Sequence, residues 1–116
     1  IFIACCEGKL DQCEINWNNK KSLCIVVCSK GYPGTFKKNL LINNIEEIKL
    51  SADEYLYHAG TTRINNKVFS SGGRVLNFVC LSKDFLEART KIFNLINQLS
   101  WEDGFYRKDI GYKVID

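Results

Sequence analysis

The chain has 116 residues, of which 46% are hydrophobic and 25% charged, the composition of an ordinary globular domain. Sixteen Lys and Arg against thirteen Asp and Glu leave a formal net charge of +3, which lacks the electrostatic signature of a nucleic-acid binder. The longest interior apolar run, residues 23–28, is far shorter than the roughly 20 residues that span a bilayer. We therefore expect one soluble domain with no nucleic-acid or membrane partner.

The first ten residues predict the end of a helix that continues from a preceding region. The sequence contains no Met and opens on Ile1, no capping residue stands before the apolar run, and Gly8 is a suitable helix stop. The run is too short for a signal peptide and lacks a charged leader. We expect residues before Ile1, and then a polar loop over 11–22 in which Ile15 and Trp17 pack against the body.

Six Cys in a short chain suggest disulfides or zinc, and their spacing favours neither. Cys24 and Cys28 on one strand face lie roughly 13 Å apart by strand rise, beyond the ~7 Å limit of a disulfide. There is no Cys-x-x-Cys pair, and His58 is the only His. We expect reduced, mostly buried thiols in a cytoplasmic protein, and no metal site. A catalytic Cys–His pair using His58 stays open, without support from the local sequence.

The first strand is expected at residues 23–28, which are apolar at every position and so predict a central strand covered on both faces. Residues 29–34 follow as a turn set by Gly31, Pro33 and Gly34. Residues 37–50 mix strand-like and helix-like spacing, and we treat them as a loop.

Two further strands and a hairpin follow. Residues 54–58 predict a strand closed by a turn at 59–61. Residues 62–64 and 67–69 flank Asn65 and Asn66, a pair that tolerates the left-handed conformations of a two-residue hairpin. Residues 74–81 predict a long strand that is apolar on both faces except at Asn77.

One interior helix follows the last long strand. Ser82 or Asp84 caps it, and an apolar stripe at helical spacing packs on the sheet through Phe85, Ala88, Ile92, Ile96 and Leu99. Residues 101–111 then predict a loop, and residues 112–115 a last short strand. The order of strands with a single late helix indicates an α+β domain with a mostly antiparallel sheet.

The sharpest binding signal is Gly72, Gly73 and Arg74, where bare backbone N–H groups and a guanidinium can hold a phosphate or carboxylate. Spacing alone favours the alternative of a hairpin turn before an exposed Arg. His58 and Thr61 offer a polar wall for a small ligand, although a structural His is the more common case. The segment 31–34 is first of all a turn, and the alternative is that it presents Tyr32 to a ligand.

No residue pair in the sequence is typical of a general acid and base, so we assign no catalytic residue. The segment Tyr106-Arg107-Lys108-Asp109 carries both signs of charge in a loop near the end of the chain, which predicts a surface ion pair.

Five segments in order resemble the C-terminal domain of the phosphoribosylamine–glycine ligase family, the glycinamide ribonucleotide synthetases of the ATP-grasp superfamily. The resemblance covers nearly the whole chain, with Lys30 and Ser70-Ser71 as departures that affect only the shape of two loops. The segments that carry it are residues 4–10, 31–34, 58–61, 72–76 and 106–111.

This resemblance implies a small, barrel-like, mostly antiparallel fold of the rudiment single hybrid motif type with one packed C-terminal helix. It implies a cytoplasmic enzyme of purine biosynthesis that uses ATP and Mg²⁺ to activate glycine as an acyl phosphate, which 5-phosphoribosylamine captures. Both cofactors would bind to preceding N-terminal and ATP-grasp domains, against which residues 1–116 form a cleft wall as the C-terminal domain. We expect this fragment alone to bind neither cofactor and to be inactive.

Two other functions stay open. A small sheet with Gly-rich loops also suits a non-enzymatic module that binds a partner protein. Nucleic-acid binding through Lys-rich loops with Tyr55, Tyr57 and Phe69 is opposed by the low net charge. The ligase interpretation requires the corners at Gly31, His58 and Gly72 to lie along one rim of the molecule.

Overall fold

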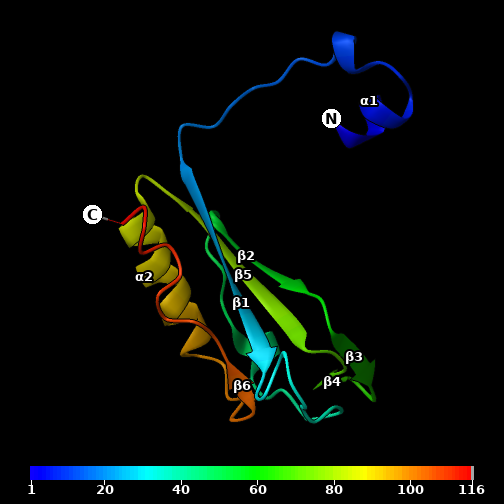
Figure 1. Cartoon of the computed structure of the whole chain (residues 1–116), viewed down its shortest axis with the longest axis vertical. Coiled ribbons are helices and arrows are strands. Elements are labelled where there is room, and N and C mark those ends of the chain that lie inside the picture. Colours follow the sequence, from blue (N-terminus) through cyan, green and yellow to red (C-terminus); the bar gives the residue numbers. More distant parts are fainter. Residues whose placement is uncertain (116) are drawn as a thin grey trace.

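A four-stranded antiparallel sheet forms the body of the molecule in the computed structural model, which describes residues 1–115 (Figure 1). The strand order is β2-β5-β1-β6, from β1 (Lys21–Ser29), β2 (Glu54–His58), β5 (Arg74–Ser82) and β6 (Gly104–Phe105). The two long strands, β1 and β5, pair along their length, with a β-bulge between Val27 and Cys28. The predicted central position of β1 is thereby confirmed, with β5 beside it.

A separate two-stranded hairpin, β3 (Thr61–Ile64) and β4 (Lys67–Ser70), follows β2. Asn65 and Asn66 connect its strands with φ angles of 47° and 60°, the left-handed values that a two-residue turn requires. The predicted hairpin is confirmed.

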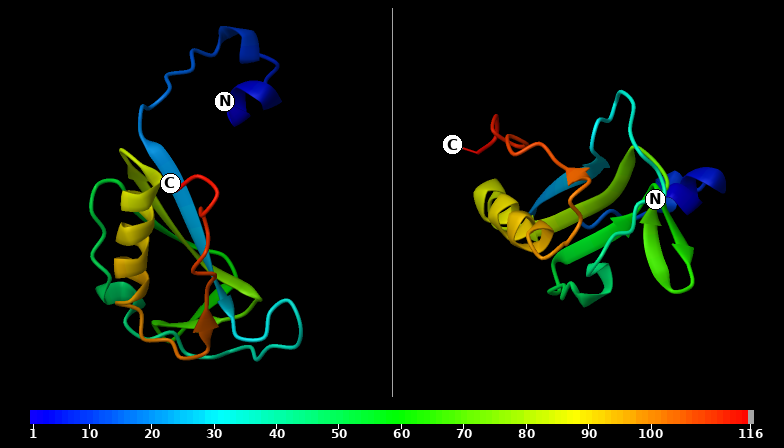
Figure 2. Two further views of the ribbon diagram at one scale, coloured as in Figure 1. Left: turned by 60° about the vertical axis from the view of Figure 1, so that its left-hand side comes forward. Right: turned by 90° about the horizontal axis from the view of Figure 1, so that it is seen from below.

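Helix α2 (Phe85–Ile96) covers one face of the sheet, over β5 and β1 (Figures 1 and 2). Of the two predicted caps, Asp84 is the one used, because its carboxylate accepts a 2.7 Å hydrogen bond from the Glu87 N–H. The helix ends before Leu99, the last residue of the predicted stripe. The core lies between helix and sheet and includes Ile25, Leu76, Phe78, Ala88 and Ile92, all at 0% exposure.

The opposite face of the sheet, which we call the outer face, lacks a helical layer. It carries the alternate residues of three strands, Tyr55 and Tyr57 of β2, Asn77 and Val79 of β5, and Cys24 and Val26 of β1. The prediction that β1 is covered on both faces is wrong for this chain, because Cys24 is exposed and Val26 is only half-buried. The apolar pattern of β1 therefore exceeds what this chain itself buries.

The prediction of mostly buried thiols is also wrong, although all six Cys are free as expected. Only Cys80 is buried; Cys5, Cys6 and Cys24 are exposed. The first two lie outside the body and Cys24 lies on the outer face, so their positions rather than their residue type decide their exposure.

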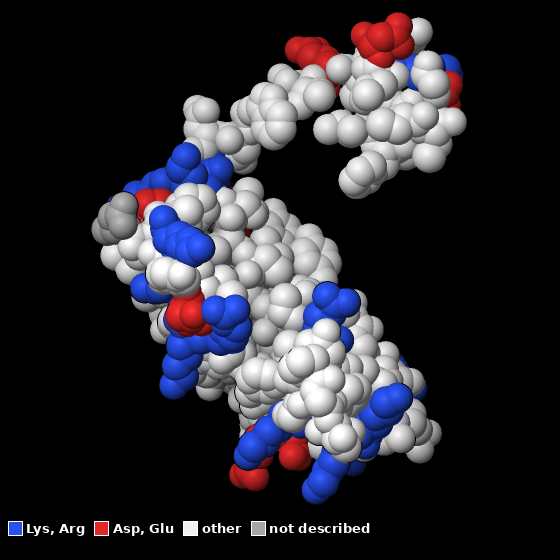
Figure 3. All heavy atoms as spheres, in the orientation of Figure 1, with Lys and Arg blue, Asp and Glu red and all other residues white. Residues whose placement is uncertain are grey.

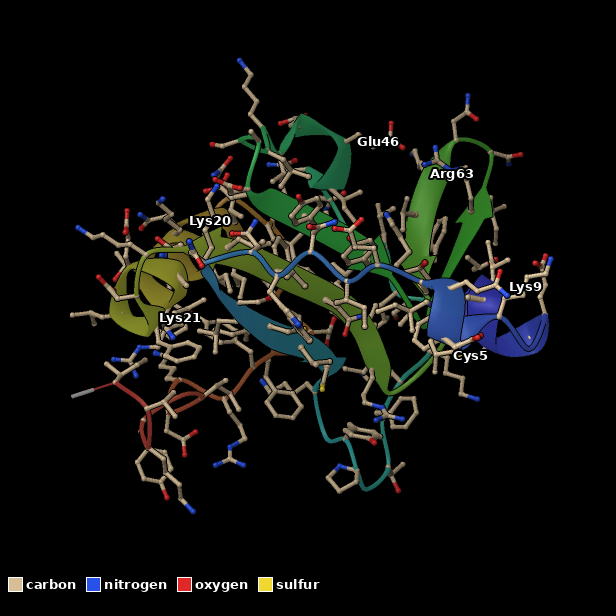
Figure 4. All side chains as sticks on the ribbon, turned by 90° about the horizontal axis from the view of Figure 1, so that it is seen from above. Cys5, Lys9, Lys20, Lys21, Glu46 and Arg63 are labelled. Atoms are coloured by element: carbon tan, nitrogen blue, oxygen red, sulfur yellow. The ribbon has the colours of Figure 1, made fainter. Side chains whose placement is uncertain are left out.

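Residues 37–50 form a loop, as predicted, with one 3₁₀ turn, η2 (Ile45–Glu47). The loop contributes Ile42 and Ile45 to the core. Glu46 forms a 2.6 Å ion pair with Arg63 of β3, and Figure 4 shows these two side chains pointing toward each other. This ion pair links the loop to the hairpin.

Residues 1–20 form an arm that leaves the body above β1 and contains α1 (Phe2–Cys6) and η1 (Leu10–Gln12) (Figures 1 and 2). The predicted stop is confirmed: Gly8 has a φ of +66°, and the Lys9 N–H donates to the Ala4 carbonyl across the helix end. The predicted packing of Ile15 and Trp17 against the body is wrong, because they are 44% and 85% exposed.

The C-terminal segment departs from the prediction in two ways. The last strand is β6, inside the predicted loop 101–111, where Gly104 pairs with Ser29. Residues 112–115 are not a strand, because Gly111 takes a φ of +83° and its carbonyl accepts bonds from Val114 and Ile115, which winds the chain into turns.

The class is α+β, with an antiparallel sheet and one main helix, as predicted. Within residues 1–115 the strands do not close into a barrel, so the barrel-like part of the expectation is replaced by an open sheet. No helix among those residues has the length and apolar character of a membrane span.

Candidate functional site

Three turns meet at one end of the sheet, where β1 and β2 finish and β5 begins. Because neighbouring antiparallel strands run in opposite directions, the ends of two strands and the start of the strand between them share one edge. The turns are residues 29–34, 58–61 and 70–74. The three corners at Gly31, His58 and Gly72 therefore lie along one rim, as the sequence analysis required.

Hydrogen bonds tie these turns together. The Ser29 hydroxyl donates to the Gly72 carbonyl at 2.8 Å, and the Ser29 N–H donates to the Gly73 carbonyl at 2.8 Å. The Gly72 N–H donates to the Gly60 carbonyl at 3.2 Å, while the Gly60 N–H donates to the Arg74 carbonyl at 3.0 Å. Ser29 is 1% exposed, so its hydroxyl connects two of the turns from a buried position and is not a surface group.

Two glycines are required by this packing. A Cβ on Gly60 would stand 2.6 Å from the Arg74 carbonyl oxygen and 2.8 Å from the Gly72 Cα, and both of these neighbours are backbone. A Cβ on Gly73 would collide with the Tyr32 ring. The glycines thus allow two chain segments and an aromatic ring to approach more closely than side chains permit.

A hollow of about 470 Å³ opens beside these turns on the outer face. Its lining mixes apolar and polar residues, namely Val26, Tyr32, Ala59, Gly73, Arg74 and Asn77. Arg74 is exposed, and no ion pair of the described residues involves it. An unpaired guanidinium beside an amide and a phenol is suited to bind a phosphate or carboxylate group.

Four of the six predicted site residues come together here. Tyr32, Gly73 and Arg74 line the hollow, and the carbonyl of the adjacent Gly72 accepts the hydrogen bond from Ser29. The other two, His58 and Thr61, lie beside the hollow rather than in its lining. Their side chains bond to each other, with 3.0 Å between His58 Nδ1 and Thr61 Oγ1. His58 shares the strand face of Leu56, which is turned toward the core.

A second, apolar hollow of about 300 Å³ adjoins the first and shares Val26 and Tyr32 with it. It is lined by Cys24, Val26, Cys28, Tyr32, Pro33, Phe105, Tyr106, Arg107 and Ile110. The Arg107 guanidinium is already held by Asp109, with contacts of 3.0 and 2.6 Å, which confirms the predicted surface pair. Arg107 therefore offers less free charge to a ligand than Arg74 does.

The thiols on this side of the sheet show the local electrostatics. Burial raises the pKa of the Cys24 thiol. Burial also raises the pKa of Cys28, and the nearby Arg74 charge opposes that rise. The positive charge of Arg74 thus acts on Cys28 of β1.

The described residues offer no cluster of oxygen ligands for Mg²⁺. No group of three or more His, Cys, Asp or Glu side chains among residues 1–115 converges as metal ligands. Hard cations such as Mg²⁺ need carboxylate or other oxygen ligands, and both hollows are lined without a carboxylate. The first hollow, which Arg74 lines, is therefore better suited to an anion than to a cation.

Sequence reasoning missed Ser29, Ala59 and Asn77. Asn77 carried a signal, because it is the one polar residue between Arg74 and Ser82, the two ends of β5. Ser29 ends an apolar strand immediately before a Gly-Pro turn, but only its burial and its bond to Gly72 show its role.

Comparison with known proteins identifies the family. The family model described as "Phosphoribosylglycinamide synthetase, C domain" matches residues 22–113. A phosphoribosylamine–glycine ligase of Caldanaerobacter subterraneus is 42% identical over 95% of the chain, and that of Escherichia coli O6:H1 is 38% identical over the whole chain. A bifunctional purine biosynthetic protein of Dictyostelium discoideum is 39% identical, also over the whole chain.

A crystal structure shows the same fold in a solved protein. The phosphoribosylamine–glycine ligase of Thermotoga maritima superposes with a TM-score of 0.70 over 93% of this chain, at 23% sequence identity. The chain spans only 26% and 27% of the two bacterial ligases above, 14% of the Dictyostelium protein and 27% of the solved chain. The match of the family model across 22–113 shows that this chain belongs to the phosphoribosylglycinamide synthetase C-domain family.

Proposed function

We propose that this chain is the C-terminal domain of a longer cytoplasmic ligase that joins glycine to 5-phosphoribosylamine in purine biosynthesis. The proposal of this reaction rests on the alignment of the chain, over 95–100% of its length, with phosphoribosylamine–glycine ligases. The longer enzyme uses ATP to activate the glycine carboxylate as an acyl phosphate, and the amine of 5-phosphoribosylamine displaces the phosphate to give glycinamide ribonucleotide, ADP and phosphate.

The part assigned to this domain is substrate binding. In the hollow beside the three turns, Arg74 supplies an exposed cation that no carboxylate of the described residues neutralises. The phosphate of 5-phosphoribosylamine, or the carboxylate of glycine, is the group that this guanidinium binds. The Gly72–Gly73 backbone holds Arg74 in place through Ser29 and Gly60, and Tyr32 bounds the hollow.

We assign the ATP and Mg²⁺ sites to the N-terminal and ATP-grasp domains of the ligase, and the lack of a group of metal ligands among residues 1–115 agrees with this assignment for Mg²⁺. The 116-residue chain alone is accordingly inactive. Its purified form should release no ADP above background in the presence of ATP, Mg²⁺, glycine and 5-phosphoribosylamine. Turnover by the fragment would contradict the assignment of ATP and Mg²⁺ binding to the preceding domains.

The binding role is tested by Arg74→Ala in the full-length ligase. We expect a higher KM for 5-phosphoribosylamine or a lower kcat, with a nearly unchanged melting temperature, because Arg74 is exposed and carries no packing role. The matched control is Arg63→Ala, an exposed Arg of the hairpin that pairs with Glu46, which should leave the kinetics unchanged. A large loss of melting temperature with normal kinetics would show that Arg74 is only part of a turn.

A further inference from the structure

A third hollow, of about 450 Å³, lies between the loop that follows β1 and the turn that precedes β6. These two segments lie side by side at the lower end of the body (Figures 1 and 2). The volume falls within the range of about 300–1,000 Å³ that is typical of small-molecule sites. The hollow shares no lining residue with the two hollows described above, and it is lined by Lys30, Thr35, Phe36, Lys37, Leu40 and Asp103.

Backbone hydrogen bonds fix the loop on both sides of this hollow. At its start, the Lys30 N–H donates to the Asp103 carbonyl at 2.7 Å. At its end, the Asn39 N–H donates to the Ser70 carbonyl at 2.6 Å, and the Ser70 N–H donates to the Leu40 carbonyl at 2.9 Å. Ser70 is 0% exposed, so the loop is attached to a buried part of the hairpin. The hollow is therefore formed before a ligand binds, which favours affinity.

Two positive charges line the hollow. Lys30 and Lys37 are exposed, and no ion pair of the described residues involves either of them. Figure 3 shows Lys and Arg side chains gathered at this lower end of the body, with acidic side chains among them. A phosphate monoester carries about two negative charges at pH 7, and Lys is a common phosphate ligand. The Thr35 hydroxyl is a further donor to such a group.

An aromatic ring in the lining indicates that the ligand is more than a phosphate ion. The Phe36 ring is half-buried and is held against the Tyr32 ring, with centroids 6.1 Å apart and an interplanar angle of 64°. Half-buried Leu40 adds a second apolar group to the lining. Nucleotide bases stack on aromatic side chains with little dependence on which base is present. A base is therefore a suitable partner for Phe36.

Asp103 supplies the third kind of group. It is half-buried, and its carboxylate takes part in no ion pair among residues 1–115. A carboxylate repels a phosphate, so Asp103 does not belong to the phosphate end of the ligand. It accepts hydrogen bonds from hydroxyl groups, and acidic side chains bind the ribose hydroxyls of nucleotides in this way. The hollow thus combines cations, an aromatic ring and a hydroxyl acceptor.

We propose that the third hollow binds a ribonucleoside 5′-monophosphate. Lys30 and Lys37 bind its phosphate, Phe36 packs against its base, and Asp103 accepts hydrogen bonds from its ribose hydroxyls. This inference goes beyond the proposed function, because the nucleotide is a second ligand and its binding requires no turnover. The Tyr32 ring, which packs against Phe36, also lines the first hollow, so one aromatic pair connects the nucleotide site to the substrate site.

The test measures binding to the full-length ligase by equilibrium dialysis at low salt. The probe is GMP, because the proposed ATP site of the longer enzyme takes an adenine nucleotide. We expect GMP to bind about tenfold or more tightly than guanosine or inorganic phosphate, since neither of these reaches both ends of the hollow. Inorganic phosphate that binds as tightly as GMP would show an adventitious ion only, and the absence of GMP binding at millimolar concentration would also overturn the proposal.

Substitutions in the same assay locate the nucleotide. The double variant Lys30→Ala/Lys37→Ala removes two exposed charges and should weaken GMP binding about tenfold or more. Lys38→Ala is the matched control, because Lys38 is an exposed residue of the same loop that lies outside the lining, and it should bind GMP as the wild type does. Loss of GMP binding in Arg74→Ala but not in the double variant would place the nucleotide in the first hollow and overturn the proposal.

The ribose contact is tested with 2′-deoxy-GMP, which should bind the wild type several-fold more weakly than GMP. Asp103→Asn should remove this preference, and an unchanged preference in that variant would contradict the place assigned to the ribose. The comparison of GMP with guanosine needs no variant, so it decides the proposal even where a variant fails to fold. GMP binding by a protein that does not make glycinamide ribonucleotide would refute the proposed function alone. An active ligase that does not bind GMP would refute the nucleotide site alone.

Discussion

The two faces of the sheet are built from alternate residues of the same three strands, and they differ in what stabilises them. On the covered face, Ile25, Phe78 and Leu76 are completely buried beneath α2 and its neighbouring loop. On the outer face, Val26, Asn77 and Tyr57 stand one position along each strand and are half-buried or exposed. The comparison separates residues that make the fold from residues that are available for recognition.

The strongest test of this contrast removes an aromatic ring from each face. Phe78→Ala opens a cavity in a close-packed core and should lower the free energy of unfolding by about 3–5 kcal/mol. Tyr57→Ala removes a ring that is 55% exposed and should cost less than about 1 kcal/mol in this chain. Urea unfolding of both variants measures the difference. Losses of similar size would show that the outer face also supports the fold.

Local signals in the sequence accounted for most of the fold. The Asp84 cap, the Asn65–Asn66 hairpin turn and the Gly8 helix stop each follow from the conformational preference of the residues involved. The three-turn rim was also predictable, because turn residues placed at the ends of paired strands must meet once the sheet forms. The placement of His58 and Thr61 beside the hollow, outside its lining, was not predictable from local signals, because the alternation along β2 puts His58 on the same face as Leu56.

The errors concern features that depend on distant parts of the chain. The strand β6 has only two residues, and Gly104 is fixed there by the Trp101 ring, against which a Cβ would clash, rather than by any strand pattern. Burial of β1 on both faces was predicted from its apolar pattern, and it is wrong for residues 1–115, in which Cys24 is exposed and Val26 is only half-buried.

A second, smaller loss of stability is expected for substitution of Ser29, which hydrogen bonds to the turn that carries Arg74. Ser29→Ala removes the donor to the Gly72 carbonyl in a buried position, which should cost about 1–3 kcal/mol. In the full-length ligase it should also raise the KM for 5-phosphoribosylamine, because the Arg74 turn loosens. The mutant Ser29→Thr retains the hydroxyl and should therefore raise the KM less than Ser29→Ala does.

The control for this effect is Ser82→Ala. Ser82 is 4% exposed and lies at the opposite end of β5, so its loss should affect stability without changing the KM. A KM that rises equally in both variants would mean that general destabilisation, and not the position of Arg74, controls substrate binding.

The smallest expected effect lies beside the outer face, where Arg107 lines the apolar hollow and bonds to Asp109. This hydrogen-bonded guanidinium lowers the pKa of Asp109. A carboxyl whose pKa is depressed by folding stabilises the folded state above its ordinary pKa, and that contribution is lost as the pH falls through the folded-state value. Because both side chains are exposed, salt should weaken the effect.

A carboxyl NMR titration of the chain measures this shift directly. Arg107→Gln should move the Asp109 midpoint upward toward its ordinary value. The midpoint of Glu87, which hydrogen bonds to Ser82 and Lys91 lower, should not move, because those groups lie on the helix side. An unchanged Asp109 midpoint would mean that the Arg107 charge is free. The apolar hollow would then compete with Arg74 as an anion site, and the contrast between the two hollows would fail.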